Sequence, residues 1–143
     1  MVKRACVFAL MLAAAACGST TTAPTLSSPA RVAGTWSGTW QATTADGGAY
    51  SSALAMTLTQ AGSTVSGTWS TSDTNGTVSG TTTNGGFSGT FTWNGASTTG
   101  GACTGTLPVS GSAGGTAMSW TSAAVTGNCT NMPTAITIAV QSR

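Results

Sequence analysis

The chain repeats a short phrase in which glycine stands between small hydroxyl residues and large apolar ones. The phrase occurs as TWSGTWQ (35–41), TVSGTWS (64–70), TVSGTTT (77–83), GFSGTFTW (86–93) and, in altered form, CTGTLPV (103–109). Each copy lies in a segment that alternates polar and apolar residues, the period of a half-buried β-strand. Glycine weakens a strand interior, so its repeated placement there requires a structural reason.

Turn signals divide the chain after residue 30 into short segments of similar length. They lie at 46–48, 61–63, 73–76, 84–86, 94–101, 111–115 and 127–133. These seven breaks leave eight segments, and none of them has helical periodicity. The pattern predicts an all-β fold, an eight-stranded antiparallel up-and-down barrel, with a two-sheet β-sandwich as the alternative.

Apolar side chains share one face of every predicted strand. They are Val32, Trp36, Trp40, Tyr50, Leu54, Met56, Leu58, Val65, Trp69, Val78, Phe87, Phe91, Trp93, Cys103, Leu107, Val109, Met118, Trp120, Ile136, Ile138 and Val140. The glycines of the repeated phrase fall on the same face, at Gly38, Gly67, Gly80, Gly89 and Gly105. A barrel closes only if its strands bend strongly, and an inward glycine permits the bend and leaves room for a neighbouring ring.

The first 30 residues differ in composition from the rest. A basic start, MVKR, is followed by the apolar run ACVFALMLAAAA, which is too short to span a membrane. Residues 1–16 are therefore predicted to be a signal peptide. Residues 17–30 are small and polar with two prolines, as in a solvated tether. Residues 31–143 form the predicted barrel domain.

The segment AAAC, Ala14 to Cys17, resembles the lipobox of bacterial lipoproteins. The resemblance implies that Cys17 is acylated and becomes the first residue of a protein anchored in the cell envelope. Gly18 stands where an aspartate would retain a lipoprotein in the inner membrane, which implies the outer membrane in a two-membrane cell. An ordinary secretory signal with an incidental cysteine is the alternative.

The motif GTW, Gly34 to Trp36, resembles the G-x-W motif of the lipocalin, avidin and fatty-acid-binding barrels. The resemblance implies that Trp36 closes one end of the barrel. It also implies that a basic side chain lies over the Trp36 ring, with Arg143 as the first candidate and Arg31 as its competitor.

Two cysteines remain once Cys6 leaves with the signal and Cys17 takes lipid. Cys103 and Cys129 map to the same rim of the predicted barrel, and an exported chain permits a disulfide. A catalytic or metal-binding thiol pair is the alternative, but the sequence contains no histidine to support it.

Charged residues are few. They are Lys3, Arg4, Arg31, Asp46, Asp73 and Arg143. Nucleic-acid binding is excluded because it requires clustered basic residues. The sequence predicts no enzyme, cofactor or metal, since both aspartates lie in predicted turns and neither histidine nor glutamate occurs.

Two functions remain. The first is a binding module for a small apolar or aromatic ligand, or a lipid, with ligand contacts from Trp36, Tyr50, Trp69, Trp93 and Trp120. The second is a structural or protein-binding module, such as an inhibitor of an envelope enzyme, in which the same rings fill the core. An eight-stranded barrel accommodates either, so the volume of its interior decides between them.

Overall fold

The computed structural model describes residues 28–96, 102–123, 125–130 and 132–143, and these form strands joined by turns. The strands are β1 Gly34–Thr44, β2 Ala49–Ala61, β3 Thr64–Ser70, β4 Thr74–Thr82, β5 Gly86–Ala96, β6 Ala102–Ser112, β7 Ala117–Ser122, β8 Thr126–Gly127 and β9 Pro133–Ser142. The predicted signal peptide, Cys17 and the tether up to residue 27 lie outside the described residues. In the part of the chain that is described, no helix is long and apolar enough to cross a membrane.

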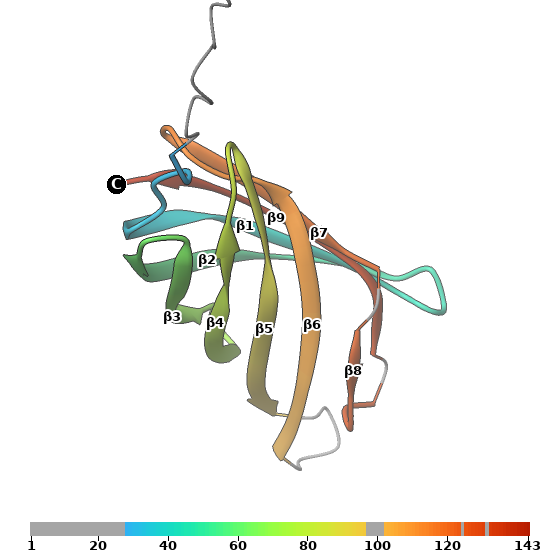
Figure 1. Cartoon of the computed structure of the whole chain (residues 1–143). Coiled ribbons are helices and arrows are strands. Elements are labelled where there is room, and N and C mark those ends of the chain that lie inside the picture. Colours follow the sequence, from blue (N-terminus) through green and yellow to red (C-terminus); the bar gives the residue numbers. More distant parts are fainter. Residues whose placement is uncertain (1–27, 97–101, 124, 131) are drawn as a thin grey trace, which may run out of the picture.

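Eight of the strands close into an antiparallel up-and-down barrel (Figure 1). Strands β1 to β7 pair in chain order, β9 pairs with β7, and the ring closes where β9 pairs with β1. At the closing seam Trp36 pairs with Ser142 and Thr43 with Ala135. The predicted barrel is therefore confirmed, and the alternative sandwich is not found.

A ninth strand, β8, supplements the barrel where two neighbours separate. β6 pairs with β7 only over Ser110–Ser112, near one barrel end. Farther along β6, the two residues of β8 pair with Gly105 and Thr106 instead. A strand of two residues has no detectable alternation, so the sequence pattern left Thr126 in the preceding segment and assigned Gly127 to a turn.

The barrel interior contains the predicted apolar face. Apart from Trp40, which is partly buried, and Tyr50, which is 60% exposed, every side chain assigned to that face is buried. Val32 is also buried, but it precedes β1 rather than belonging to it. The inward parity of the strands is thus confirmed by the structure.

The inward glycines lie where the strands approach each other closely. A Cβ atom built on Gly38 would lie 2.0 Å from the carbonyl oxygen of Ala139, on β9. One built on Gly105 would lie 2.2 Å from the Trp93 ring. Both distances are shorter than real Cβ contacts, so glycine is needed for the strand curvature and for the ring beside it.

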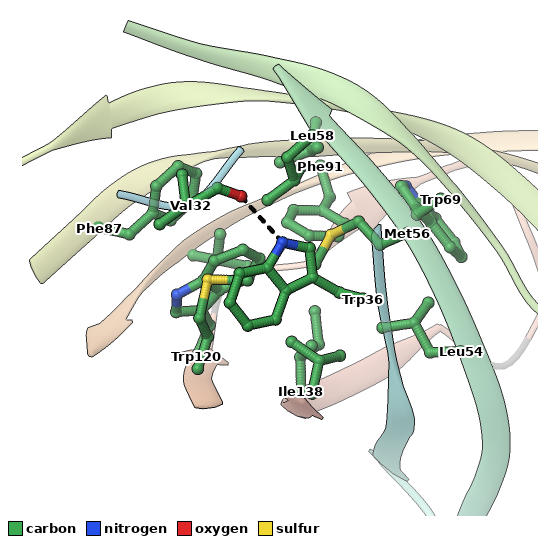
Figure 2. Packing of buried hydrophobic residues seen from close by; sticks show 14 of the residues in the cluster. Val32, Trp36, Leu54, Met56, Leu58, Trp69, Phe87, Phe91, Trp120 and Ile138 are labelled. Atoms are coloured by element: carbon green, nitrogen blue, oxygen red, sulfur yellow. Dashed lines mark hydrogen bonds between the residues drawn. The ribbon is translucent and has the colours of Figure 1, made fainter. Parts of the chain in front are cut away.

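The chain before β1 closes one end of the barrel. The amide of Val32 donates to Gln60 Oε1 (2.8 Å), and Gln60 Nε2 donates to the Ala30 carbonyl (2.9 Å). The Trp36 indole N–H donates to the Val32 carbonyl (2.8 Å), as the dashed line in Figure 2 shows. We call this the closed end, and it also carries the turns β2–β3, β4–β5 and β6–β7.

Candidate binding pocket at the open end of the barrel

A pocket of about 240 Å³ lies at the opposite end of the barrel, which we call the open end. Its walls come from β1 to β6, β9 and the loop before β9. The lining residues are Trp40, Ala42, Thr44, Tyr50, Trp69, Thr74, Trp93, Cys103, Cys129, Thr130, Met132, Pro133 and Ile136.

Three of the four aromatic residues that line the pocket are tryptophans, and they come from alternate strands of the barrel. Trp40 lies on β1, Trp69 on β3 and Trp93 on β5, each at an inward position near the open end. The ring centroids of Trp40 and Trp69 are 6.3 Å apart, in a tilted pair. Such rings offer flat apolar faces to a ligand.

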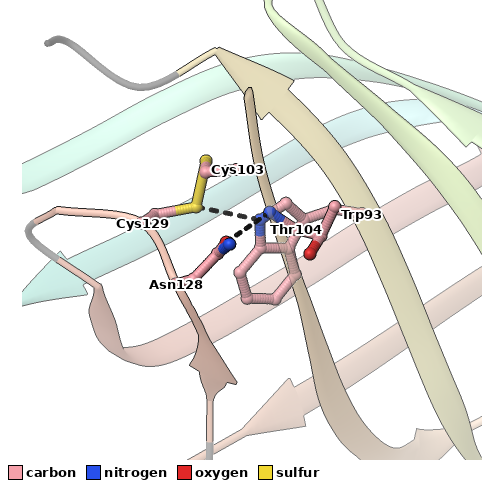
Figure 3. The surroundings of a disulfide bond; sticks show 5 residues. All are labelled: Trp93, Cys103, Thr104, Asn128 and Cys129. Carbon is pink, nitrogen blue, oxygen red and sulfur yellow. Dashed lines mark hydrogen bonds between the residues drawn. A yellow bond between two sulfur atoms is a disulfide. The ribbon is translucent and has the colours of Figure 1, made fainter. Parts of the chain in front are cut away.

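The disulfide between Cys103 and Cys129 forms part of the pocket wall. It joins the start of β6 to the loop that precedes β9, as Figure 3 shows. Asn128 reinforces the attachment with two hydrogen bonds. Its side-chain Oδ1 accepts from the Thr104 backbone amide (2.7 Å), and its backbone amide donates to the Thr104 carbonyl (3.1 Å). The predicted disulfide is confirmed, and it fixes one wall of the pocket as well as the fold.

Below the pocket the barrel interior is filled. A void there has a volume of about 10 Å³ and apolar walls, among them Trp40, Leu54 and Leu107. A space of that size holds at most one water molecule, and only if it has polar partners. The Trp69 ring contacts the Phe91 ring, with centroids 5.9 Å apart, and the Phe91 ring contacts the Trp120 ring, with centroids 5.7 Å apart. The pocket therefore ends at a packed floor.

The pocket is electrically neutral, because no charged residue is found among its described lining residues. The nearest turn holds Asp46, which is fully exposed. Hydrogen bonds from the Thr44 hydroxyl and then from the Gly48 amide lower the pKa of the Asp46 carboxyl. These bonds occupy Asp46 within its own turn, as is usual for aspartate in hairpins. The pocket itself suits an uncharged ligand.

Only some of the predicted ligand residues meet at this site. Trp69, Trp93 and Tyr50 line the pocket, with Tyr50 at its rim. Trp36 and Trp120 do not line it, because both are buried in the filled part of the barrel. There Trp120 stacks on Phe87, with ring centroids 4.5 Å apart.

The residues predicted to close a barrel end do lie at the closed end. Gly34 starts β1 with a φ of 141°, and Trp36 is 3% exposed. Arg143 donates its backbone amide to the Thr35 carbonyl (3.1 Å). Among the described residues, neither Arg143 nor its competitor Arg31 makes a cation–π contact with Trp36. The polar contact found at the Trp36 indole is instead its hydrogen bond to the Val32 carbonyl (2.8 Å).

Sequence reasoning identified the inward position of Trp40 but did not assign it to the site. It also missed Met132, from the loop before β9, and Pro133, the first residue of β9. Trp40 shares the parity of Trp36 within TWSGTWQ, and its place near the open end of β1 was the available signal. Met132 and Pro133 both fall in the predicted turn 127–133, which has no periodicity, so the sequence contained no signal for them.

Comparisons of the chain with protein-family models, with curated proteins and with solved structures found no match. Among the described residues there is also no group of three or more His, Cys, Asp or Glu side chains that could hold a metal ion. The function must therefore be argued from the pocket itself.

Proposed function

We propose that this protein is a non-catalytic binding module that takes up a small, neutral, ring-shaped apolar compound at the open end of its barrel. The observation that carries the proposal is the pocket of about 240 Å³ between Trp40, Trp69 and Trp93. Apolar pockets with a few polar groups are the usual form of a small-molecule site.

The size of the pocket limits the ligand. An apolar cavity of about 150 Å³ holds benzene, and drug-sized ligand pockets begin at about 300 Å³. At about 240 Å³, this pocket suits a compound of one or two fused rings. A long acyl chain would need space in the interior, where the void measures about 10 Å³. Of the ligands expected from the sequence, a small aromatic compound therefore fits better than a lipid.

We also propose that the protein is anchored in the cell envelope by acylated Cys17, with the pocket facing away from the anchoring bilayer. The described chain begins beside the closed end, where the Ala30 amide donates to the Thr83 carbonyl (3.0 Å) (Figure 1). A tether that precedes residue 28 would enter from that side. Ligand would then reach the open end from the aqueous compartment.

The alternative function is a structural or protein-binding module. The packed interior between the pocket and the closed end favours this alternative, because it leaves no room for a ligand there. The loops at the open end would then be the contact surface for a partner. In that case the tryptophan-lined pocket would have no small-molecule ligand.

Calorimetric titration with naphthalene tests the proposal. The exported chain would carry Cys17→Ser, which keeps every described residue. We expect saturable binding of one naphthalene per chain, because the apolar rings of the pocket offer a neutral site of matching size. Absence of binding both of naphthalene and of quinoline, a compound of the same shape that carries an acceptor nitrogen, would overturn the proposal in favour of the alternative function.

A pair of leucine variants locates the binding. Ala42 is buried and lines the pocket, so Ala42→Leu places carbon atoms where the ligand would lie. We expect affinity to fall about tenfold or more, since each excluded methylene costs about 0.8 kcal/mol of burial. Ala55→Leu adds the same atoms to the exposed outer face of β2 and should leave affinity unchanged. Equal affinity in the Ala42→Leu variant would contradict binding in this pocket.

A further inference from the structure

The indole N–H groups of the three pocket tryptophans have different hydrogen-bonding states. Trp69 Nε1 donates to the Thr92 carbonyl (3.0 Å), and Trp93 Nε1 donates to Cys129 Sγ (3.5 Å). Both donors are therefore already used by the protein; Figure 3 shows the second of these bonds. Trp40 Nε1 donates to no atom of the described residues.

The free N–H of Trp40 remains accessible to solvent. In the described part of the chain, Trp120 Nε1 is the one buried side-chain nitrogen or oxygen without a hydrogen-bond partner. Because Trp40 is only partly buried and also lacks a partner, its nitrogen must be accessible to solvent. The Trp40 ring borders both the pocket and the void beneath it, so the donor belongs to a residue at the base of the site.

We propose that Trp40 determines ligand specificity by donating its indole N–H to a hydrogen-bond acceptor on the bound compound. The inference rests on the proposed function and names its ligand class more closely: a neutral aromatic compound that carries a ring nitrogen, carbonyl or ether oxygen. A site that presents a donor disfavours a ligand without an acceptor, because ligand binding then removes water from the donor without replacement.

Three other polar side chains around the pocket do not supply the same selectivity. The Thr44 hydroxyl donates to Asp46, and the Thr74 hydroxyl is paired with that of Thr71 (3.0 Å). Tyr50 is 60% exposed at the rim, and its hydroxyl both donates and accepts, so it does not discriminate between acceptors and donors. The Trp40 N–H can only donate.

Quinoline and naphthalene form a matched pair of probes, because they share one shape and only quinoline has an acceptor nitrogen. Dissociation constants of both would be measured at neutral pH, where quinoline is uncharged. The proteins would be the Cys17→Ser chain and the same chain with Trp40 replaced by 3-benzothienylalanine, which has sulfur in place of the indole N–H. We expect the replacement to weaken quinoline about 2- to 10-fold relative to naphthalene, the range for one net hydrogen bond.

The same replacement at Trp69 is the control. Its N–H is engaged with Thr92, so its loss should leave the ratio of the two dissociation constants unchanged. Circular dichroism would verify that each variant keeps its strands. If both probes bind and the Trp40 replacement leaves their ratio unchanged, the inference is overturned while the proposed function stands. If neither probe binds the unmodified site, the proposed function and the inference both fail.

Discussion

The barrel closes because glycine leaves space where any other side chain would collide with the neighbouring strand. At Gly38 the obstacle is the backbone of β9, namely the Ala139 carbonyl oxygen and, at 2.7 Å from a built Cβ, the Val140 Cα. Backbone atoms in a paired strand cannot rotate away as a flexible side chain can. A single missing methyl group therefore permits the seam that joins the last strand to the first.

Replacing Gly38 by alanine tests this account at the level of one residue. Where space and backbone angles allow, Gly→Ala stabilises a protein by about 0.4–1 kcal/mol. Here we expect the opposite sign, a loss of about 1–3 kcal/mol in the free energy of unfolding, because the added methyl group overpacks the seam. Urea denaturation measures the change.

The adjacent residue provides the control. Ser37 lies on the outer side of the same strand, and its hydroxyl makes no hydrogen bond with the described residues, so Ser37→Ala should alter stability by no more than about 0.5 kcal/mol. A stabilising Gly38→Ala would show that the inward glycines are not required for closure.

Residue parity was predictable from sequence, and individual contacts were not. Alternation places Trp40, Trp69 and Trp93 on one face without any knowledge of the partner strands. Whether an indole N–H lies near a carbonyl acceptor depends on the register between strands. The pairing of β4 with β5, for example, places the Thr92 carbonyl beside Trp69. Register is a property of the assembled sheet, so a parity argument could not separate Trp40 from the other two.

At the scale of elements, the segment before β1, residues 28–33, closes one end of the barrel. We call this segment the plug. Gln60 holds it through two hydrogen bonds, since its side-chain amide accepts from the Val32 N–H and donates to the Ala30 carbonyl. The sequence analysis assigned residues up to 30 to the tether and Val32 to the first strand. Neither assignment predicted the plug, because its sequence has no hydrophobic periodicity and its attachment depends on one residue of β2, Gln60.

Gln60→Met tests the plug. Methionine has a similar length but cannot accept the hydrogen bond of the fully buried Val32. We expect a loss of about 1–3 kcal/mol, the cost of an unsatisfied buried donor. Thermal and urea denaturation give the value. Gln41→Met, at an exposed position of β1 whose side chain bonds to no described residue, should be neutral. Equal stability of both variants would contradict the anchoring role of Gln60.

The disulfide also holds two elements together, β6 and the loop before β9. Its removal should lower both the stability of the protein and its affinity for a ligand in the pocket. Cys103 and Cys129 are 26 residues apart in sequence. The double variant Cys103→Ser, Cys129→Ser should lose about 2–4 kcal/mol in the chain-entropy account. It should also bind naphthalene more weakly, because Cys129 and Met132 line the pocket from the loop that the bond attaches.

Two measurements support or refute that expectation. The Cys17→Ser chain, denatured without reduction, should contain no free thiols. Titration of the double variant with naphthalene should give a lower affinity than titration of the parent chain. A double variant as stable as the parent chain, with unchanged affinity, would contradict both roles of the bond.

The whole molecule has two unlike ends, one sealed by the plug and one lined with indoles. The number of strands in the closed barrel, and the closure itself, could be predicted from the seven turn signals and the inward glycines, since these are local features repeated along the chain. The distribution of filled and empty space could not, because it depends on how inward rings from different strands share the interior. Trp36 and Trp120 fill it, whereas Trp69 and Trp93 border the pocket.

Membrane attachment is a prediction for the full chain. Cys17→Ser should move the protein from the membrane fraction to the soluble fraction, because it removes the residue at which we propose that the anchoring acyl chains are attached. Cys6→Ser, within the predicted signal peptide, should leave the partition unchanged. Immunoblots of separated fractions report the outcome. Persistence of the Cys17→Ser protein in the membrane fraction would refute lipidation as the anchor.

The two unlike ends can be examined in one experiment, because the chain has five tryptophans and each gives a separate indole N–H signal. Naphthalene would be titrated into the ¹⁵N-labelled Cys17→Ser chain while these five signals are followed by NMR. We predict saturable shifts for Trp40, Trp69 and Trp93 at the open end. The signals of Trp36 and Trp120, packed near the closed end, should stay in place. Shifts of all five signals, or of none, would contradict a barrel filled at one end and open to a ligand at the other.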